Sequence, residues 1–360
     1  MFTSIDLGSE YIKVLVMEYI DNKYNVLAST KVKSLGIKKG LIAEPDLVIK
    51  CLKEALTNIY REIELKVNKI ILNIPSFDVE TRIVNTEVEL SGLVKGSDLT
   101  NLYKHAIREN VEENRHVLSV FPIDFIVDSE EKVVDPKGMN GSVLEGRLLI
   151  STIPEELYRM YEDLFNKLEI EIVDICISPI ADYLELSRES FNKDYGAVVD
   201  IGTGKTEIGI FNKGLMIKSG ILEYGSKKVD LEIRNTYNID IKTAKEFKLD
   251  YGFAVKNYSD SDTFLATNKN GEEVIVKQKE LSGIIEDKLV DLLKNVKKYL
   301  LDLTNKKINY IIITGGISNI PMFNILCEGI FGDLTYIKNE ATLGCRDNGF
   351  TTCAGMVKNL

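Results

Sequence analysis

The sequence predicts an α/β protein in which two strand-rich blocks are separated by an inserted α/β subdomain. Apolar segments typical of strands alternate with amphipathic segments typical of helices along the 360 residues. The stretch Asp6-Leu-Gly-Ser is echoed by Asp200-Ile-Gly-Thr, and each follows an apolar strand. Residues 82–165 differ in character and interrupt the first block.

The first block begins with two predicted strands, "YIKVLVMEYI" (11–20) and "YNVLAST" (24–30). Residues 46–65 have helical periodicity, with a predicted apolar stripe at Leu47, Ile49, Leu52, Leu56, Ile59 and Ile63. A buried strand, "KIILNIP" (69–75), follows. The insertion then holds the strand "IVNTEVEL", a helix from about Asp98, the strand "RLLIST" and a helix opened by Pro154.

The second block starts at "EIVDICI" and continues with the strands "AVVDIGTGKTEIGIF", "GLMIKSGIL" and "INYIIIT". Residues 257–273 are polar and predict a loop or hairpin. Residues 281–303 predict a long helix with one apolar stripe, made of Leu281, Ile284, Ile285, Leu289, Leu292, Val296, Tyr299 and Leu303. A last helix is expected to open at Pro321.

Composition disfavours several function classes. The net charge is −10 and no long basic run occurs, which argues against a nucleic-acid-binding protein. The N-terminus has no signal-peptide pattern, and no window approaches the ~20 apolar residues of a membrane span. Two histidines and no CxxC pair argue against a Cys/His metal site. We expect buried, reduced thiols in a cytosolic protein, at Cys51, Cys176, Cys327, Cys345 and Cys353.

The two echoed turns have the chemistry of a phosphate site. Glycine lets the backbone approach a phosphate closely, consecutive amides form an anion-binding nest, and hydroxyl side chains add donors. The predicted phosphate-binding residues are Gly8, Ser9, Lys13, Gly202, Thr203, Gly204 and Lys205. Asp6 and Asp200 would repel phosphate directly, so we expect them to hold Mg²⁺ through water molecules.

Each of these turns also allows another interpretation than a phosphate site. Either turn alone is more typical of a simple hairpin tip, since Asp and Gly are common turn residues. The string "GKT" at 204–206 resembles a P-loop, but the pattern needs a glycine where Val199 stands, and "TEIGIF" alternates like a strand. A third element favours a ligand site: the strand "NYIIIT" leads into Gly315-Gly316, where a ribose or flat ligand can approach the backbone.

Together these three elements resemble the actin-like ATPase superfamily, and within it the FtsA family of bacterial cell-division proteins. "SLGIKKGLI" (34–42), "DPKGMNGSVLEG" (135–146), "AKEFKLDYG" (244–252) and "IIEDKLVDLL" (284–293) carry the FtsA resemblance, which covers essentially the whole chain. The resemblance implies an actin-like, ribonuclease H-like, two-lobed fold. Its subdomains would be 1A (1–81, 166–195 and 341–360), an inserted 1C (82–165), 2A (196–225 and 304–340) and 2B (226–303).

The resemblance also implies function. FtsA-like proteins bind ATP with Mg²⁺, form actin-like filaments, hydrolyse ATP slowly if at all, and tether FtsZ at the inner face of the membrane. The implied adenosine-binding residues are Lys245, Glu246, Lys248, Gly315, Gly316 and Ile317. The FtsZ tail would dock on 2B, with Lys288 as a candidate contact, although a solvated helix lysine is an equally good interpretation. Later division proteins would contact 1C.

The chain departs from the family pattern at three places. Lys245 stands where the family usually has a glutamate, so nucleotide affinity or base preference is expected to differ. Lys288 replaces an arginine and loses the bidentate fork for a carboxylate. The sequence ends at "TTCAGMVKNL" without an amphipathic lipid-binding helix, so membrane contact is expected only through a missing helix or a partner.

Two alternatives remain open within the superfamily. A small-molecule kinase would need a substrate pocket with a carboxylate base, for which no motif is seen. A scaffold similar to the pilus-assembly protein PilM would bind a pilus-protein peptide in place of the FtsZ tail.

Overall fold

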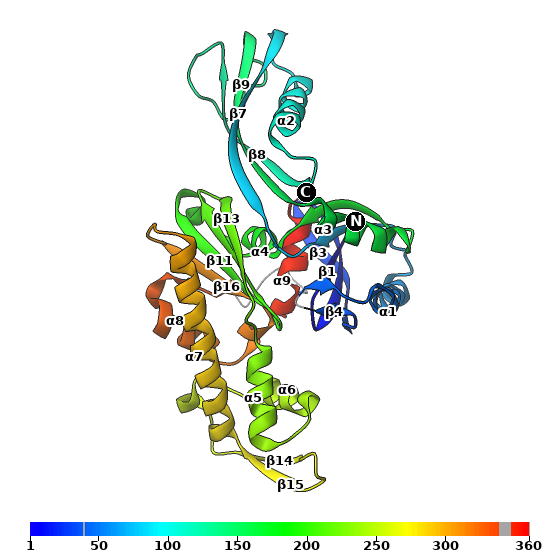
Figure 1. The fold of residues 1–360 in the computed structure, drawn as a ribbon, viewed down its shortest axis with the longest axis vertical. Helices are drawn as coiled ribbons and strands as arrows, with labels where there is room; N and C mark the ends of the chain where they lie inside the picture. Colours follow the sequence, from blue (N-terminus) through cyan, green and yellow to red (C-terminus); the bar gives the residue numbers. More distant parts are fainter. Residues whose placement is uncertain (39, 338–346, 360) are drawn as a thin grey trace. The chain divides into compact units, whose positions relative to one another are not determined.

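The computed structural model describes residues 1–38, 40–337 and 347–359, and they form two compact units. One unit contains residues 1–75 and 164–360, and the other contains residues 76–163 (Figure 1). The smaller unit is an insertion in the larger one, as the change of character along the sequence predicted. The mixed α/β architecture is also as predicted.

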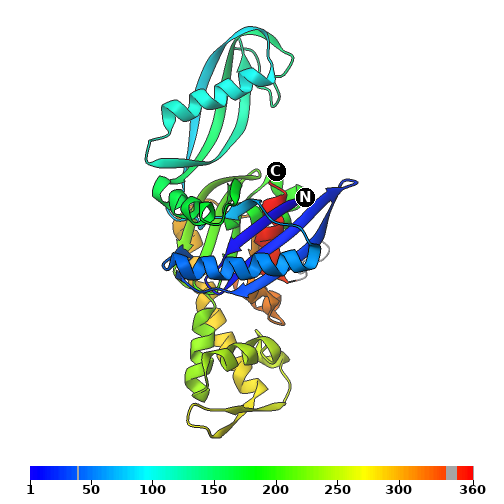
Figure 2. The same cartoon turned by 90° about the vertical axis from the view of Figure 1, so that its right-hand side faces the viewer.

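The first sheet of the larger unit has the strand order β10-β6-β1-β2-β3. Its strands are β1 (Phe2–Leu7), β2 (Tyr11–Ile20), β3 (Lys23–Lys33), β6 (Lys69–Asn73) and β10 (Glu171–Cys176). The short strands β4 (Ile37–Lys38) and β5 (Leu41–Ile42) form a separate pair. Helix α1 (Pro45–Ile63) packs on β3 and β2 (Figure 2).

The predicted apolar stripe of α1 was partly wrong. The buried face is made of Val48, Cys51, Leu52, Ala55 and Ile59, whereas Leu47 is exposed. Cys51 and Ala55 are small and lie one turn apart, so this face lets the helix approach the sheet more closely than the larger residues would.

The second sheet has the order β13-β12-β11-β16-β17 and repeats the pairing of the first. Its strands are β11 (Tyr195–Ile201), β12 (Thr206–Asn212), β13 (Leu215–Leu222), β16 (Tyr310–Thr314) and β17 (Thr335–Tyr336). In the first sheet, β1 pairs antiparallel with β2 and parallel with β6. In the second, β11 pairs antiparallel with β12 and parallel with β16. Each echoed turn therefore joins the first two strands of an equivalent half.

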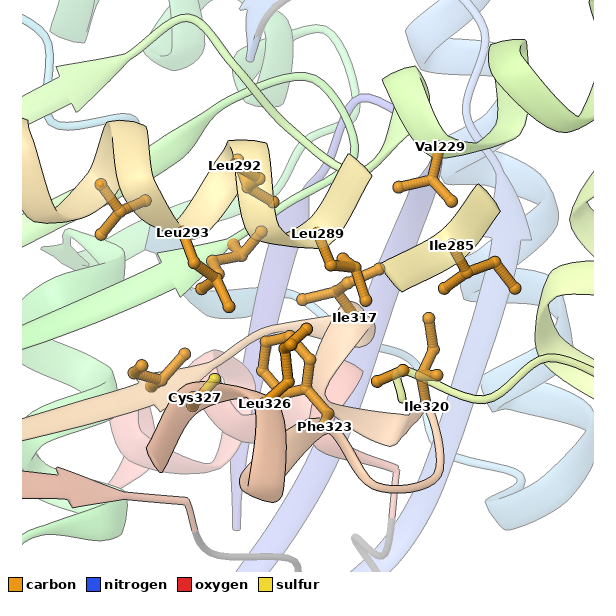
Figure 3. Packing of buried hydrophobic residues seen from close by; sticks show 14 of the residues in the cluster. Val229, Ile285, Leu289, Leu292, Leu293, Ile317, Ile320, Phe323, Leu326 and Cys327 are labelled. Carbon is orange, nitrogen blue, oxygen red and sulfur yellow. The ribbon is translucent and has the colours of Figure 1, made fainter. Parts of the chain in front are cut away.

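One hydrophobic core of this unit lies between the second sheet and the helices packed on it. These are α5 (Lys227–Tyr237), α6 (Ile241–Asp250), α7 (Gln278–Leu303) and α8 (Phe323–Phe331), with the hairpin β14 (Thr263–Thr267) and β15 (Glu273–Lys277). Leu289 and Leu293 of α7 point toward Phe323 and Cys327 of α8 (Figure 3). The 257–273 segment is thus part of a hairpin. Pro321 does not open a helix, because α8 begins two residues later, after Met322 in a left-handed conformation.

Short 3₁₀ turns complete the larger unit at Glu189–Lys193, Lys256–Tyr258, Gly316–Asn319, Gly332–Leu334 and Asn348–Phe350. Helices α4 (Ser178–Leu186) and α9 (Thr351–Val357) pack on each other at its centre. α9 contacts β1 and β6 of the first sheet, and α4 contacts β11 and β12 of the second. A Cβ atom at Gly355 would lie 1.8 Å from the carbonyl oxygen of Ala181, so only glycine permits this crossing.

The inserted unit is a three-stranded antiparallel sheet with one helix packed on it. Its order is β7-β9-β8, and its elements are β7 (Glu80–Leu93), α2 (Gly96–Asn110), β8 (Arg115–Val127) and β9 (Asn140–Pro154), with α3 (Glu155–Asn166) following. Leu102 of α2 packs where a Cβ at Gly146 would come within 2.6 Å of its Cδ2 atom. The insertion therefore has its own core.

Arg115 joins the two ends of the inserted unit. Its guanidinium donates to the Asp78 carboxylate at 2.7 Å and to the Thr152 carbonyl at 3.0 Å, and the side chain is only 8% exposed. Lysine cannot reproduce this fork, so Arg115→Lys is expected to lower the unit's stability by about 1–3 kcal/mol. Hydrogen exchange on the whole chain should show faster exchange around residues 78 and 152. The more exposed Arg147→Lys is the matched control, and equal effects would contradict the prediction.

Four of the five cysteines test the thiol prediction. Cys51, Cys176, Cys327 and Cys353 are buried, as predicted, while Cys345 lies outside the described residues. None of the helices in the described part of the chain is both long and apolar enough to cross a membrane.

Candidate nucleotide-binding site

A pocket of about 260 Å³ lies in the larger unit, between the two echoed turns. All the predicted phosphate and metal residues line it: Asp6, Gly8, Ser9, Lys13, Asp200, Gly202, Thr203, Gly204 and Lys205. Of the predicted adenosine residues, it is lined by Lys245, Lys248, Gly315, Gly316 and Ile317. Glu246 is not among the lining residues; it lies on the exposed side of α6, 3.7 Å from Lys242.

Next to the first turn, three polar side chains on adjacent strands line the pocket. Asp6 lies opposite Lys13 on β2 and opposite Asn73 on β6. Lys13 Nζ lies 2.8 Å from Asp6 Oδ2, and Asn73 Nδ2 donates to Asp6 Oδ1 at 2.9 Å. Burial alone would raise the pKa of Asp6, but Lys13 and Asn73 outweigh it and the pKa is lowered. Asp6 is therefore an ionised, oriented carboxylate at neutral pH.

Ser9 is oriented by a neighbouring loop. The Gly40 amide donates to Ser9 Oγ at 2.9 Å. With its oxygen accepting this bond, the Ser9 hydroxyl proton can be directed toward a ligand oxygen. Gly40 adopts φ +84°, and a Cβ there would lie 2.7 Å from Lys205 Cε. The 34–42 segment thus packs against both turns.

The second turn is fixed against helix α5. The Gly202 amide donates to the Lys205 carbonyl at 2.9 Å, closing the turn. The amides of Ser226 and Lys227 donate to the carbonyls of Gly202 and Thr203, each at 3.0 Å. The structure gives a hairpin here, as predicted, and no P-loop helix follows the lysine.

Asp200 differs from Asp6 in its surroundings. In the described part of the chain, no side chain hydrogen-bonds or ion-pairs with its carboxylate. Burial and the nearby carboxylates of Glu207 and Asp6 raise the pKa of Asp200 from 3.8 to about 6, although Lys13 opposes the rise. A half-buried carboxylate that lines a pocket and has no hydrogen-bond or ion-pair partner among the described side chains fits a hard divalent cation such as Mg²⁺.

A hydrogen-bonded chain connects the two halves behind the phosphate turns. Asn73 Nδ2 donates to Ser178 Oγ at 3.1 Å, and Ser178 donates to Glu207 Oε2 at 3.1 Å. Lys205 Nζ lies 2.9 Å from the same oxygen. These contacts give Lys205 a carboxylate partner, Glu207, within its own hairpin. Glu207 also lines the pocket, in addition to Asp6 and Asp200.

The glycine pair lies where the second sheet meets the pocket. Gly315 follows β16 with φ +97°, and a Cβ there would lie 2.4 Å from the Ile201 carbonyl and 2.7 Å from Asp200 Oδ1. Any side chain at this position would collide with both, so the close approach requires glycine.

Two further lysines that the sequence analysis named as binding candidates already have carboxylate partners in the structure. Lys248 reaches the pocket but its ammonium lies 2.5 Å from Asp230, and both side chains are buried. Lys288 lies on the surface of α7, 3.2 Å from Glu232 of α5.

Two family models match this chain. The model described as cell division protein FtsA matches residues 197–355, and the model of the SHS2 domain inserted in FtsA matches residues 76–152. Together they cover well over half of the sequence. The chain belongs to the FtsA family.

FtsA relatives extend the similarity over nearly the whole chain. FtsA of Streptococcus pneumoniae is 26% identical, over 97% of this chain and 78% of the relative. FtsA of Bacillus subtilis is 26% identical, over 99% of this chain and 83% of the relative. The match to the SHS2 domain inserted in FtsA covers residues 76–152, and so overlaps most of the FtsA-type insertion predicted at residues 82–165.

Solved structures confirm the actin-like fold. A PilM-PilN type IV pilus biogenesis complex aligns with a TM-score of 0.65 and 13% identity, covering 99% of this chain and 98% of that one. MreB5 of Spiroplasma citri bound to AMPPNP aligns with a TM-score of 0.57 and 15% identity, covering 99% and 94%. At these identities the likeness concerns the fold alone.

The sequence motifs did not identify four residues whose side-chain contacts form part of the site: Asn73, Ser178, Glu207 and Glu10. Asn73 ends a buried strand, so its place at the strand's carboxyl end was a usable signal. Ser178 opens α4, and Glu207 is the second residue of β12, two residues after Lys205. The fourth missed residue, Glu10, lies inside the first turn.

Proposed function

We propose that this FtsA-family chain binds ATP with Mg²⁺ between the two turns, polymerises into actin-like filaments, and organises FtsZ at the division site. The observation that carries the proposal is the equivalent placement of Asp6 and Asp200, each at the end of the first strand of a repeated hairpin, on one pocket.

The residues present fit this ligand. Gly8, Ser9 and the 202–204 turn would cradle the phosphates, and the Gly315-Gly316 backbone would contact the adenosine. Asp6 and Asp200 would hold Mg²⁺, largely through its water molecules. When bound, the cation neutralises phosphate charge and offsets the repulsion between the carboxylates.

The partners follow the FtsA family. We propose that the FtsZ C-terminal tail docks on residues 226–303, where the half-buried Lys288 places its ammonium beside Glu232. We further propose that later division proteins contact the inserted unit, and that the protein works at the inner face of the cell membrane at the division site. Relatives named FtsA are cell division proteins, which supports this placement.

Two assays on the intact chain test the proposal. Sedimentation should show assembly with Mg²⁺-ATP and none when EDTA is added. An FtsZ tail peptide should bind, and Lys288→Glu should weaken that binding about tenfold by reversing the charge. Lys297→Glu, on the same helix, is the control. Absence of both assembly and tail binding, despite tight ATP binding, would contradict the proposal, and binding of a pilus-protein peptide instead would favour a PilM-like scaffold.

A further inference from the structure

Glu10 occupies an unusual position for an acid, because it lies inside the first phosphate turn and faces the second. The Thr203 hydroxyl donates to Glu10 Oε2 at 2.7 Å. Glu10 Oε1 pairs with the Lys245 ammonium on α6. All three residues line the pocket, and their contacts connect the first turn, the second turn and the adenosine side.

Glu10 is held in its charged form. Burial alone would raise the pKa of this carboxyl, but the hydrogen bonds from Lys245 and Thr203 outweigh it, so the pKa is lowered. The Thr203 hydroxyl has a single proton, and it is used on Glu10. While this contact persists, Thr203 cannot donate to a phosphate, and the carboxylate repels any anion placed beside the turn.

Lys245 also differs from the other lysines of the pocket. Lys13 pairs with Asp6 on the adjacent strand, and Lys205 pairs with Glu207 two residues along the chain. Lys248 is buried against Asp230. Lys31, which also lines the pocket, pairs with Asp347. Lys245 instead pairs with Glu10 of the first turn, and its side chain is 25% exposed, more than those of Lys13, Lys205 and Lys248. Lys245 is therefore placed to exchange Glu10 for a ligand group beside the two turns.

We propose that Glu10 takes, in the nucleotide-free protein, the contacts that a ligand phosphate takes in the bound one, and that Lys245 exchanges Glu10 for that phosphate. The ligand class is a nucleoside polyphosphate, and the inference rests on the proposed function. Glu10 is an internal competitor that lowers nucleotide affinity.

Calorimetry on the intact protein tests this with Mg²⁺-ATP, tripolyphosphate and adenosine as separate ligands. Glu10→Gln should tighten binding of Mg²⁺-ATP and of tripolyphosphate about tenfold, and leave adenosine binding unchanged. Asp250→Asn is the control, since it removes one negative charge from an exposed position on the same helix, α6, outside the pocket. It should change no affinity.

Partner exchange also predicts a non-additive effect. In the wild type, Lys245→Met removes one ion pair before binding and one after, so the ATP affinity should change less than about threefold. In the Glu10→Gln background Lys245 has only the ligand, so the same substitution should weaken binding about tenfold.

Three results would overturn the inference. Weaker or unchanged ATP binding by Glu10→Gln, with a wild type that binds, would show that Glu10 does not compete, while leaving the proposed function intact. An equal gain for adenosine would show that Glu10 acts through overall closure and not through phosphate. Failure of both wild type and Glu10→Gln to bind ATP would overturn the proposed function and this inference together.

Discussion

Asp200→Asn is expected to stabilise the nucleotide-free protein while removing its Mg²⁺-dependent nucleotide binding. The folded state raises the pKa of Asp200 from 3.8 to about 6. The ionised carboxylate is therefore disfavoured in the folded state, and the penalty is absent below about pH 4, grows between these two pKa values and is complete above about pH 6. A shift of this size corresponds to about 3 kcal/mol, which the uncharged amide would recover.

Urea unfolding of the nucleotide-free protein checks this at pH 4.5 and pH 7.5. Asp200→Asn should gain about 3 kcal/mol over wild type at the higher pH and much less at the lower. Asp6→Asn is the matched control and should have the opposite sign, because Lys13 and Asn73 lower the pKa of Asp6 and its charge stabilises the fold. A loss of stability in both variants at pH 7.5 would rule out the explanation.

Lys248→Met is expected to lower the free energy of unfolding by about 3–5 kcal/mol, because it leaves a buried carboxylate without its partner. Asp230 is fully buried and Lys248 nearly so, with the ammonium 2.5 Å from the carboxylate. Burial raises the pKa of Asp230 even with Lys248 beside it. Lys248 is the largest of the effects that oppose the burial of this charge, so removing it leaves the Asp230 carboxylate largely uncompensated.

Denaturant unfolding of single and double variants separates the pair from its surroundings. Adding Asp230→Asn to Lys248→Met should restore most of the lost stability, because the unpaired charge is removed with it. Lys288→Met breaks the surface pair with Glu232 and should lose less than about 1 kcal/mol. If the double variant is no more stable than Lys248→Met, charge burial is not the cause.

The two phosphate turns were predictable because their geometry is local. An acid, a glycine and a hydroxyl residue in sequence define the hairpin, and flanking apolar strands confirm it. The Asn73–Ser178–Glu207 chain was not, because it joins β6, α4 and β12, which are far apart in the sequence. No local pattern reports which side chains of such distant elements meet.

The ion-pair partners of charged residues could not be predicted from the sequence either. The sequence singles out Lys245 and predicts a changed nucleotide affinity, but the physical reason depends on its ion pair with Glu10, which only the structure shows. Lys248 matched the family pattern, yet the structure engages it with Asp230. The buried face of α1 was partly wrong because apolar periodicity alone does not show which of two neighbouring rows of apolar residues packs against the sheet.

The crossing of α4 and α9 connects the two sheets that border the candidate site. α9 supports the sheet that carries Asp6, and α4 supports the sheet that carries Asp200. A Cβ at Gly355 would lie 1.8 Å from the Ala181 carbonyl oxygen, so the two helix backbones meet with no side chain between them. Although Gly355 does not line the pocket, a side chain there would push the two sheets apart, and we expect it to alter the pocket between Asp6 and Asp200.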